Sequence, residues 1–163
     1  MGHLTDVLIL DDDLNVAKAL RRDLVPLKAS ISITSSCSEA LSILESQKID
    51  VIIADIFMPE MNGIELLQIV AQQHPKVIRV VMTGASDIQT AVAAINDGRI
   101  AYFISKPWEP EQLHSCIRQL YSVIENEKNQ VIDHEEATLE ILNLKKQNQQ
   151  LSAMAYKDVL TQL

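Results

Sequence analysis

The sequence predicts an α/β fold in which five parallel strands alternate with helices. Short apolar segments alternate with amphipathic ones from residue 4 to about residue 120. Some apolar segments are almost continuous, as at residues 77–82, which is typical of strands buried on both faces of a sheet. Repeated strand–helix units with short connections favour a parallel sheet with right-handed crossovers and helices on both faces.

Local signals give the bounds of each element. We expect strands at residues 6–10, 30–34, 50–55, 77–82 and 100–105, and helices at residues 14–27, 37–47, 63–73 and 86–98, with a fifth helix from near Glu109. Ser36, Asn62 and Ser86 precede three of these helices, and their side chains are of the types that cap helix N-termini. Asp97-Gly98 is a typical helix end.

Composition excludes several classes of protein. The chain has 163 residues, of which 47% are apolar, so it can form one domain of ordinary size with an appendage. It contains neither an apolar run long enough to span a bilayer nor an N-terminal signal peptide, and we expect a cytoplasmic protein. We expect Cys37 and Cys116 to be reduced thiols on helices. The net charge of −8 argues against nucleic-acid binding by this chain.

Charged and hydroxyl side chains follow four of the predicted strands. Asp11, Asp12 and Asp13 follow the first strand, Asp55 closes the third, Thr83 follows the fourth and Lys106 follows the fifth. Because the carboxyl ends of parallel strands meet at one edge of a sheet, where ligands of such folds bind, we expect these groups to lie close together. Asp13 stands one residue further into its loop, and we expect it to point away from the site.

This set of groups suits phosphoryl transfer to a carboxylate. A hard cation such as Mg²⁺ cancels the repulsion between two anions and prefers oxygen ligands. We expect Asp11 and Asp12 to face the metal, and Asp55 both to bind it and to act as the nucleophile. The Lys106 ammonium and the Thr83 hydroxyl would then contact phosphoryl oxygens.

These residues closely resemble the receiver domain of two-component response regulators over residues 4 to about 122. The resemblance rests on four segments that follow strands: Asp11-Asp12, Asp55-Ile56-Phe57-Met58-Pro59-Glu60-Met61-Asn62-Gly63, Thr83-Gly84-Ala85 and Phe103-Ile104-Ser105-Lys106-Pro107-Trp108. It implies a flavodoxin-like fold with strand order 2-1-3-4-5. It also implies that a histidine kinase or phosphotransfer protein donates a phosphoryl group to Asp55.

The resemblance assigns further roles. It implies that Mg²⁺ is bound by Asp12, Asp55 and the main-chain carbonyl of Phe57, and that the Lys106-Pro107 peptide bond is cis. Phe103 stands at the position of the aromatic switch residue, which turns inward as Thr83 moves toward the phosphate. This movement would change the face formed by the fourth helix, fifth strand and fifth helix, which is also a candidate dimer surface.

Two other functions of similar sheets fit the sequence less well. A haloacid-dehalogenase-type phosphatase uses an aspartyl nucleophile, but it needs a second Asp two residues later, where this chain has Phe57. A flavin-binding flavodoxin-like protein needs a Ser/Thr-rich phosphate loop after the first strand, where this chain has three carboxylates. We therefore expect a regulator and not an enzyme, whose own chemistry is to gain and lose a phosphoryl group.

The sequence changes character after the fifth predicted strand. From Glu111 to Lys157 it contains neither Gly nor Pro, and apolar residues recur at near-heptad spacing, with Asn148 in the second apolar stretch. This pattern favours a parallel two-stranded coiled coil, and hence a homodimer, although a solvated linker helix also fits. We divide the chain into a receiver at 1–122, a helical linker at 123–155 and the start of an output domain at 156–163.

The last residues carry a second resemblance. Asp158-Val159-Leu160-Thr161-Gln162-Leu163 is similar to the opening of GGDEF domains, the diguanylate cyclases, although Gln162 replaces the usual Gly. The chain is then expected to be a piece of a larger regulator in which phosphorylation controls a cyclase. A different output, such as an HD-type phosphodiesterase, is the alternative that the sequence leaves open.

Overall fold

A five-stranded parallel sheet forms the centre of the protein. The computed structural model describes residues 5–97 and 99–126. The strands are β1 (Asp6–Leu10), β2 (Ser30–Thr34), β3 (Val51–Asp55), β4 (Ile78–Thr83) and β5 (Tyr102–Ser105). They pair in the order β2-β1-β3-β4-β5, and every pair is parallel. The sheet type and the strand order are as the sequence predicts.

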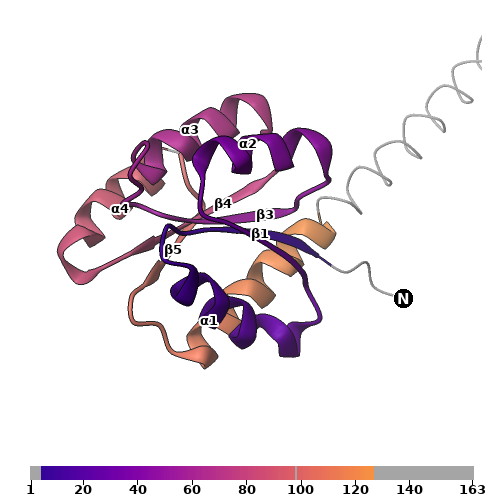
Figure 1. The fold of residues 1–163 in the computed structure, drawn as a ribbon. Coiled ribbons are helices and arrows are strands. Elements are labelled where there is room, and N and C mark those ends of the chain that lie inside the picture. The colour runs from indigo at the N-terminus through magenta and orange to yellow at the C-terminus, as the bar shows by residue number, and fades with distance from the viewer. Residues whose placement is uncertain (1–4, 98, 127–163) are drawn as a thin grey trace, which may run out of the picture. The chain divides into compact units, whose positions relative to one another are not determined.

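Helices connect the strands and cover both faces of the sheet. They are α1 (Leu14–Leu24), α2 (Cys37–Ser46), α3 (Gly63–Gln73) and α4 (Ile88–Asn96), with 3-10 turns at Val25–Leu27 and Ala85–Asp87. A further helix occupies residues 110–126 of the described chain. Figure 1 shows α2, α3 and α4 on one face of the sheet, and α1 with the helix that begins at residue 110 on the other. The compact unit formed by the sheet and these helices extends to Tyr121.

Alternating residues of the strands fill two apolar layers. Leu8, Leu10, Ile52 and Ala54 are fully buried and pack with side chains of α2, α3 and α4. The intervening residues of the same two strands are equally buried and point to the opposite face: Val7, Ile9, Val51 and Ile53. Because β1 and β3 are apolar on both sides, they occupy the middle of the sheet, and their carboxyl ends lie at its centre.

Two of the predicted helix caps are confirmed. The side chain of Ser36 accepts a hydrogen bond from the main-chain N–H of Glu39 at the start of α2. The side chain of Asn62 accepts one from Ile64 at the start of α3, at 2.8 Å. Each cap satisfies a backbone donor that has no partner within its own helix, so both helices begin where the sequence predicts.

Two predicted helices are shorter than expected. The first ends at Leu24, and a 3-10 turn follows it, because Pro26 has no N–H to donate to an α-helical hydrogen bond. The fourth begins at Ile88, after the turn Ala85–Asp87. Ser86 lies within that turn and donates its hydroxyl to the Asp87 carboxylate, so it is not the cap of α4. Helix α4 ends at Asn96.

Several predictions fall outside the described residues. They include the role of Gly98, the part of the coiled-coil pattern after residue 126 with Asn148, and the GGDEF-like residues Asp158–Leu163. The first apolar residues of that pattern, Ile117, Leu120 and Ile124, lie in the described chain and are buried. Within the described part of the chain, no helix is both long and apolar enough to cross a membrane. Cys37 and Cys116 are free thiols.

Candidate functional site

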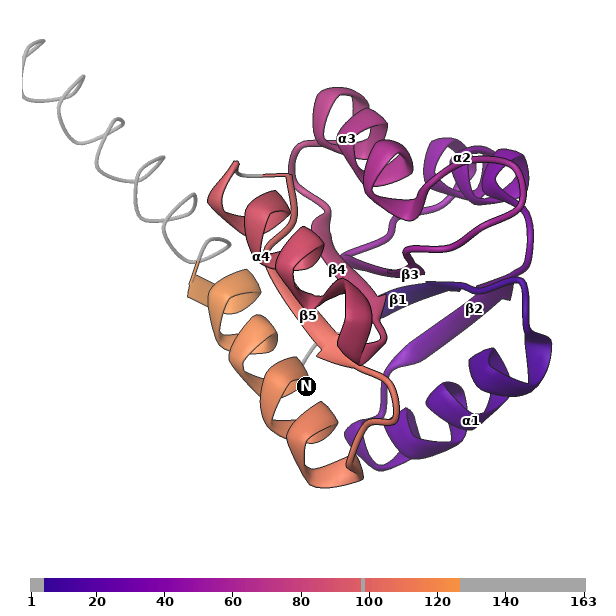
Figure 2. The same ribbon diagram turned by 90° about the vertical axis from the view of Figure 1, so that its left-hand side faces the viewer.

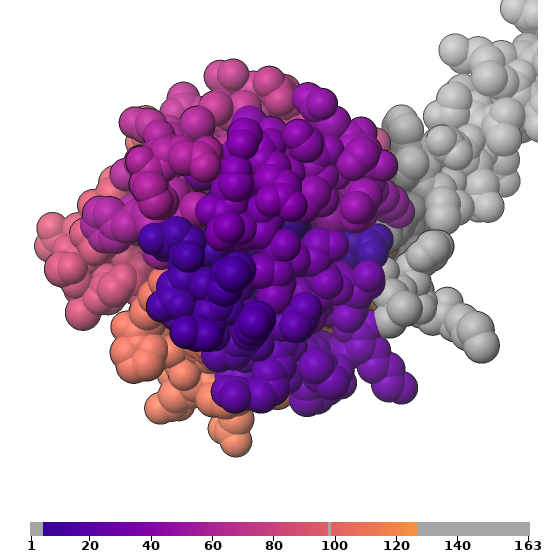
Figure 3. All heavy atoms as spheres, viewed as in Figure 1, coloured from indigo at the N-terminus to yellow at the C-terminus, as the bar shows by residue number. Residues whose placement is uncertain are grey.

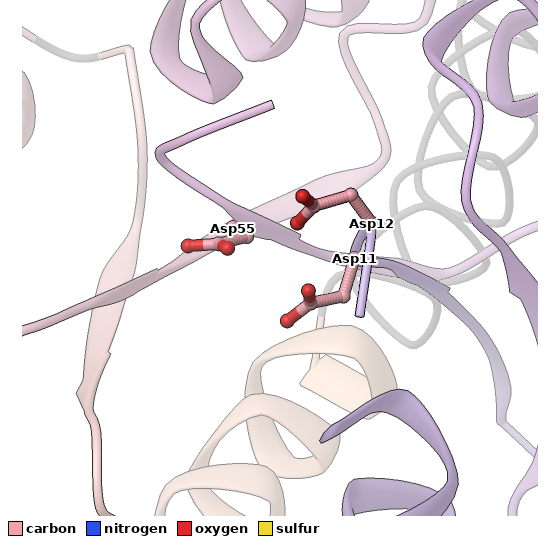
Figure 4. Close-up of side chains that lie close together, drawn as sticks. All are labelled: Asp11, Asp12 and Asp55. Atoms are coloured by element: carbon pink, nitrogen blue, oxygen red, sulfur yellow. The ribbon is translucent and has the colours of Figure 1, made fainter. Parts of the chain in front are cut away.

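Three carboxylates meet where the chain order of the strands reverses. The chain passes from β1 to its neighbour β2 on one side, and from β3 to its neighbour β4 on the other. Asp11 and Asp12 directly follow β1, and Asp55 is the last residue of β3. Their carboxylate oxygens lie within 4.8 Å of one another. Figure 4 shows the three side chains turned toward the same side. In parallel sheets this is the usual place for a ligand.

Asp11 is held from several directions and is fully buried. Its main-chain N–H donates to the carbonyl of Thr34, at the end of β2. Its Oδ1 accepts from the main-chain N–H of Asp13 at 2.9 Å. Burial raises the pKa of Asp11 above its usual range, and the hydrogen bond from Asp13 and the charge of Lys106 offset this only in part. Such a group gains from the approach of a cation.

Asp13 does not belong to the cluster but caps the next helix. Its side chain accepts a hydrogen bond from the main-chain N–H of Asn15, at 3.0 Å, and so satisfies the start of α1. The expectation that Asp13 points away from the site is consistent with this bond. The sequence analysis did not identify this cap, although an Asp just before a predicted helix is the signal that could have shown it.

Gly63 lets helix α3 approach the main chain of Asp55. The N–H of Gly63 donates to the carbonyl of Ile56 at 2.7 Å. A Cβ atom at Gly63 would lie 2.0 Å from the main-chain oxygen of Asp55, far inside van der Waals contact. The absence of a side chain at this position therefore allows the N-terminus of α3 to fix the backbone of Asp55 directly.

Lys106 joins the carboxylates from the end of β5. Its Nζ lies 3.0 Å from Oδ2 of Asp11 and 3.1 Å from Oδ2 of Asp55. Burial by itself lowers the pKa of Lys106, but the hydrogen bonds and negative charges of Asp11 and Asp55 outweigh it, and the net pKa is raised. The side chain is therefore cationic at neutral pH. The Lys106-Pro107 peptide bond is cis, as the resemblance implies.

Thr83 lies at the same edge, but its hydroxyl donates its hydrogen bond elsewhere and not to the carboxylates. It is 1% exposed, and its hydroxyl donates to the carbonyl of Gly84 at 3.1 Å. Its own carbonyl accepts from the N–H of Lys106 at 2.8 Å, which ties the ends of β4 and β5 together. The hydroxyl would have to leave Gly84 to reach a group bound at Asp55.

Phe103 and Phe57 differ in exposure. Phe103, in β5, is half-buried and packs against the apolar layer on the α2, α3 and α4 face of the sheet. Phe57, two residues after Asp55, is 62% exposed, and its main chain forms an isolated antiparallel bridge with Asn62. This bridge closes the loop between β3 and α3.

The donor set suits a divalent cation. Three carboxylates with oxygens within 4.8 Å of one another form the kind of ligand set that a hard cation such as Mg²⁺ prefers. Asp12 is exposed and Asp11 is buried, so the cluster opens to solvent on the side of Asp12. Asp11, Asp12 and Asp55 are the residues that would hold the metal.

Three residues outside the carboxylate cluster form contacts that the sequence did not predict. The indole N–H of Trp108 donates to Oδ2 of Asp23 at 2.9 Å, and the ring of His114 contacts the main-chain oxygen of the same residue. Trp108 lies in the connection just before the last helix, which begins at residue 110. Asp23 follows two arginines at the end of an amphipathic helix, and no sequence signal distinguishes it from an ordinary surface acid.

Comparison with known proteins agrees with this geometry. The chain is 35% identical over 113 residues to the hydrogenase transcriptional regulatory protein HoxA of Cupriavidus necator. The match covers 69% of this chain and 23% of the relative. It is 34% identical over 120 residues to the C4-dicarboxylate transport transcriptional regulatory protein DctD of Rhizobium meliloti, covering 73% and 26%. The chain therefore spans about a quarter of the length of these relatives.

A solved structure is also similar to this chain. It is the signal receiver domain of an HD domain-containing protein from Pseudomonas fluorescens, with a TM-score of 0.72 at 29% identity, covering 79% of this chain and 95% of that one. Residues 7–118 match the response regulator receiver domain family. With the strand order and the carboxylate cluster in place, the chain belongs to the family of response regulator receiver domains.

Proposed function

We propose that this protein is a receiver that is switched by phosphorylation of Asp55. The observation that supports this most directly is the position of Lys106, whose Nζ lies 3.0 Å from Asp11 and 3.1 Å from Asp55 within a cluster of three carboxylates. An ammonium between two carboxylates can pair with an incoming phosphoryl oxygen as it releases one of them. The donor is a phosphohistidine of a histidine kinase or phosphotransfer protein.

The chemical step follows from the positions of the side chains. An oxygen of the Asp55 carboxylate attacks phosphorus, the new O–P bond forms, and the P–N bond to the donor imidazole breaks. The electron pair of that bond stays on the imidazole nitrogen, which takes up a proton. β3 and the N-terminus of α3 hold the Asp55 backbone during this exchange, through the close approach of Gly63.

A bound Mg²⁺ supplies positive charge that lowers the repulsion between the carboxylate and the phosphoryl group. Asp11, Asp12 and Asp55 would hold it, and the main-chain carbonyl of Phe57 is the additional ligand that the family implies. Buried Asp11, whose pKa is raised by burial, is the carboxylate that is least favourably solvated before a cation arrives.

The signal would leave the site through Thr83 and Phe103. Phosphorylation adds about −2 of charge beside Asp55, which attracts the Thr83 hydroxyl away from Gly84. Phe103 pairs with Val81 in the neighbouring strand and is half-buried, so space vacated near Thr83 allows it to turn further inward. Figure 2 shows the face that this would change, where α4 and the helix from residue 110 flank β5.

The sequence also supports a proposal for the output domain that this receiver controls. The resemblance of Asp158–Leu163 to the start of GGDEF domains supports a diguanylate cyclase. HoxA and DctD carry names of transcriptional regulators, and the Pseudomonas fluorescens receiver belongs to an HD domain-containing protein, so receivers like this one serve several outputs. The sequence of the whole gene that encodes this chain would distinguish these outputs.

An aspartyl-nucleophile phosphatase is the alternative from another class. It would need an acid two residues after Asp55, and that position holds Phe57, which is 62% exposed. Within the described residues, the cluster that could hold a metal consists of Asp11, Asp12 and Asp55, and it offers no fourth carboxyl group as the acid. Turnover of a phosphate ester by the purified protein would favour this alternative.

Incubation with Mg²⁺ and acetyl phosphate tests the proposed function. We expect intact-mass spectrometry to show one added phosphoryl group that is lost at alkaline pH, and we expect no addition to Asp55→Asn. A phosphate that persists in Asp55→Asn would show that another residue is the acceptor. No addition to the wild-type protein in the presence of Mg²⁺ would contradict the function itself.

A further inference from the structure

The connection that carries Lys106 is fastened to the far end of helix α1. Residues 106–109 join β5 to the helix that begins at residue 110. In this connection, Trp108 donates its indole N–H to Oδ2 of Asp23, at 2.9 Å, and Asp23 is the penultimate residue of α1. Nε2 of His114 lies within hydrogen-bond distance of the main-chain oxygen of Asp23. Because a carbonyl oxygen can only accept, the ring nitrogen carries the proton.

Helix α1 is thus linked to the Lys106 segment at both of its ends. It begins just after Asp11, whose Oδ2 pairs with Nζ of Lys106 at 3.0 Å. It ends at the contact with Trp108, two residues beyond Lys106. In Figure 3, the orange segment that contains the start of the last helix borders the indigo α1, in agreement with these contacts.

The contact between Asp23 and Trp108 is of a kind that restrains position. The Asp23 side chain is 18% exposed, so its carboxylate is largely shielded from water. A hydrogen bond from an indole N–H to a carboxylate is charge-assisted and stronger than a neutral one. Arg22 lies 3.6 Å from Oδ1 of Asp23, but its side chain is 76% exposed and therefore adds little.

The Lys106 ammonium needs such a restraint because it bridges two acceptors. The main chain of Lys106 is held on one side by its hydrogen bond to Thr83 at 2.8 Å. The flexible side chain must still place Nζ within about 3 Å of both Asp11 and Asp55, at 3.0 and 3.1 Å. A small displacement of the connection would lose one of these contacts, and such misplacement lowers rates of group transfer.

We propose that Asp23 and Trp108 are positioning residues for phosphoryl transfer to Asp55. Their hydrogen bond holds the connection 106–109 against α1 and so keeps the Lys106 ammonium between the two carboxylates. The inference rests on the function proposed above and adds two residues that lie outside the cluster of Asp11, Asp12, Asp55 and Lys106. Their effect on the reaction is exerted through Lys106.

The first test compares variants in the rate of phosphorylation by acetyl phosphate with Mg²⁺. Trp108→Phe keeps the aromatic packing and removes the N–H donor, and we expect a rate roughly three- to tenfold lower than that of the wild type. Asp23→Ala removes the acceptor and should give the same loss. Asp23→Asn keeps an oxygen that accepts from the indole, so we expect it to retain a rate close to that of the wild type.

The second test separates positioning from general loss of stability. In a Lys106→Ala background, the contact has no ammonium to place, so Trp108→Phe should change the rate by less than about twofold. The decrease in Tm caused by Trp108→Phe should nevertheless be the same in both backgrounds. A merely structural role would reduce the rate by the same factor with and without Lys106.

Tyr102→Phe is the matched control. It removes the Tyr102 hydroxyl, which contacts Gln119 at 3.4 Å. This contact also joins β5 to the last helix, but it does not involve the connection that carries Lys106. We expect it to leave the rate unchanged. The inference is overturned if Trp108→Phe leaves the wild-type rate unchanged, or if it slows the Lys106→Ala protein by the same factor. Absence of phosphorylation in the wild-type protein would instead contradict the proposed function, and the inference with it.

Discussion

Asp11 is a carboxylate that the fold buries at the expense of stability. Its pKa is raised, chiefly by burial, above the ordinary value of 3.8. Between that value and the raised one, the folded state binds more protons than the unfolded state, so the free energy of unfolding falls as the pH rises through this window. At neutral pH the charged side chain therefore destabilises the folded protein, and a cation would relieve this cost.

We predict that Asp11→Asn raises Tm in metal-free buffer at neutral pH, on the order of 3 °C, and that it abolishes or strongly slows phosphorylation by acetyl phosphate. The amide keeps an acceptor for the N–H of Asp13 and removes the buried charge. Thermal unfolding with EDTA at pH 7 and pH 4 provides the measurement, and the difference should shrink at pH 4. Asp12→Asn, at an exposed position, is the control and should change Tm less. A lower Tm for Asp11→Asn at pH 7 would contradict the prediction.

Gly63 is the residue whose lack of a side chain matters most at the site. We predict that Gly63→Ala lowers the free energy of unfolding by about 1–3 kcal/mol, because its Cβ would lie 2.0 Å from the Asp55 carbonyl oxygen. The displaced Asp55 should also accept phosphate more slowly. Chemical denaturation and acetyl phosphate labelling measure the two effects.

Gly84→Ala provides the matched control for Gly63→Ala. Gly84 follows Thr83 at the same edge of the sheet, but a Cβ atom at Gly84 would meet no atom within 4 Å. The φ angle of Gly84, −77°, is one that any residue adopts. We expect its stability to stay within about 0.5 kcal/mol of the wild type. Equal losses at both glycines would show that the close approach at Gly63 is not the cause.

At the scale of single elements, the loop from β3 to α3 depends on one cap. The Asn62 side chain satisfies the N–H of Ile64 at 2.8 Å, and its main chain bridges to Phe57. The same residue therefore sets the start of α3 and the shape of the loop that follows Asp55. Loss of this cap should therefore affect both the start of α3 and the loop that follows Asp55.

We predict that Asn62→Ala lowers the free energy of unfolding by about 0.5–2 kcal/mol, since one backbone donor of α3 loses its acceptor. Asn62→Ser keeps a hydroxyl that caps well and should lose clearly less. Denaturant unfolding of the two variants measures the difference. If both substitutions cost the same, the capping bond at this position contributes nothing measurable.

The sequence predicted the elements well where local signals and burial agree. Strands β1 and β2 begin and end at the expected residues: β1 is an apolar run that ends before Asp11, and β2 alternates polar and apolar residues. α3 also matches, with Asn62 before it. The helix errors at Pro26 and at Ser86 arise where a helical pattern continues into residues that form a 3-10 turn. Apolar periodicity continues through such turns, so it does not mark the end of regular α-helical bonding. The predicted strands 50–55, 77–82 and 100–105 differ from β3, β4 and β5 by one or two residues at their ends.

At the scale of the whole molecule, we predict that the chain dimerises through residues that follow the receiver. The heptad-like spacing after residue 122 supports this, and it lies largely outside the described residues. Multi-angle light scattering should show more dimer for the full chain than for the chain ending at residue 122, as a measured mass that exceeds the monomer mass by a larger factor. Dimers of equal strength in both would place the interface on the receiver itself, for example on the face of α4 and β5.

The sequence by itself determined the class of sheet, the strand order through the resemblance, and the group of Asp11, Asp12, Asp55 and Lys106. These follow from short-range patterns, because parallel strands bring their carboxyl ends to one edge whatever the details of packing. Only the tertiary structure decided the burial that raises the pKa of Asp11, the contact of Gly63 with Asp55, and the bond between Asp23 and Trp108. The burial of Asp11 and the bond between Asp23 and Trp108 depend on segments far apart in the chain, and the Gly63 contact depends on the path of the loop after Asp55; no local pattern encodes either.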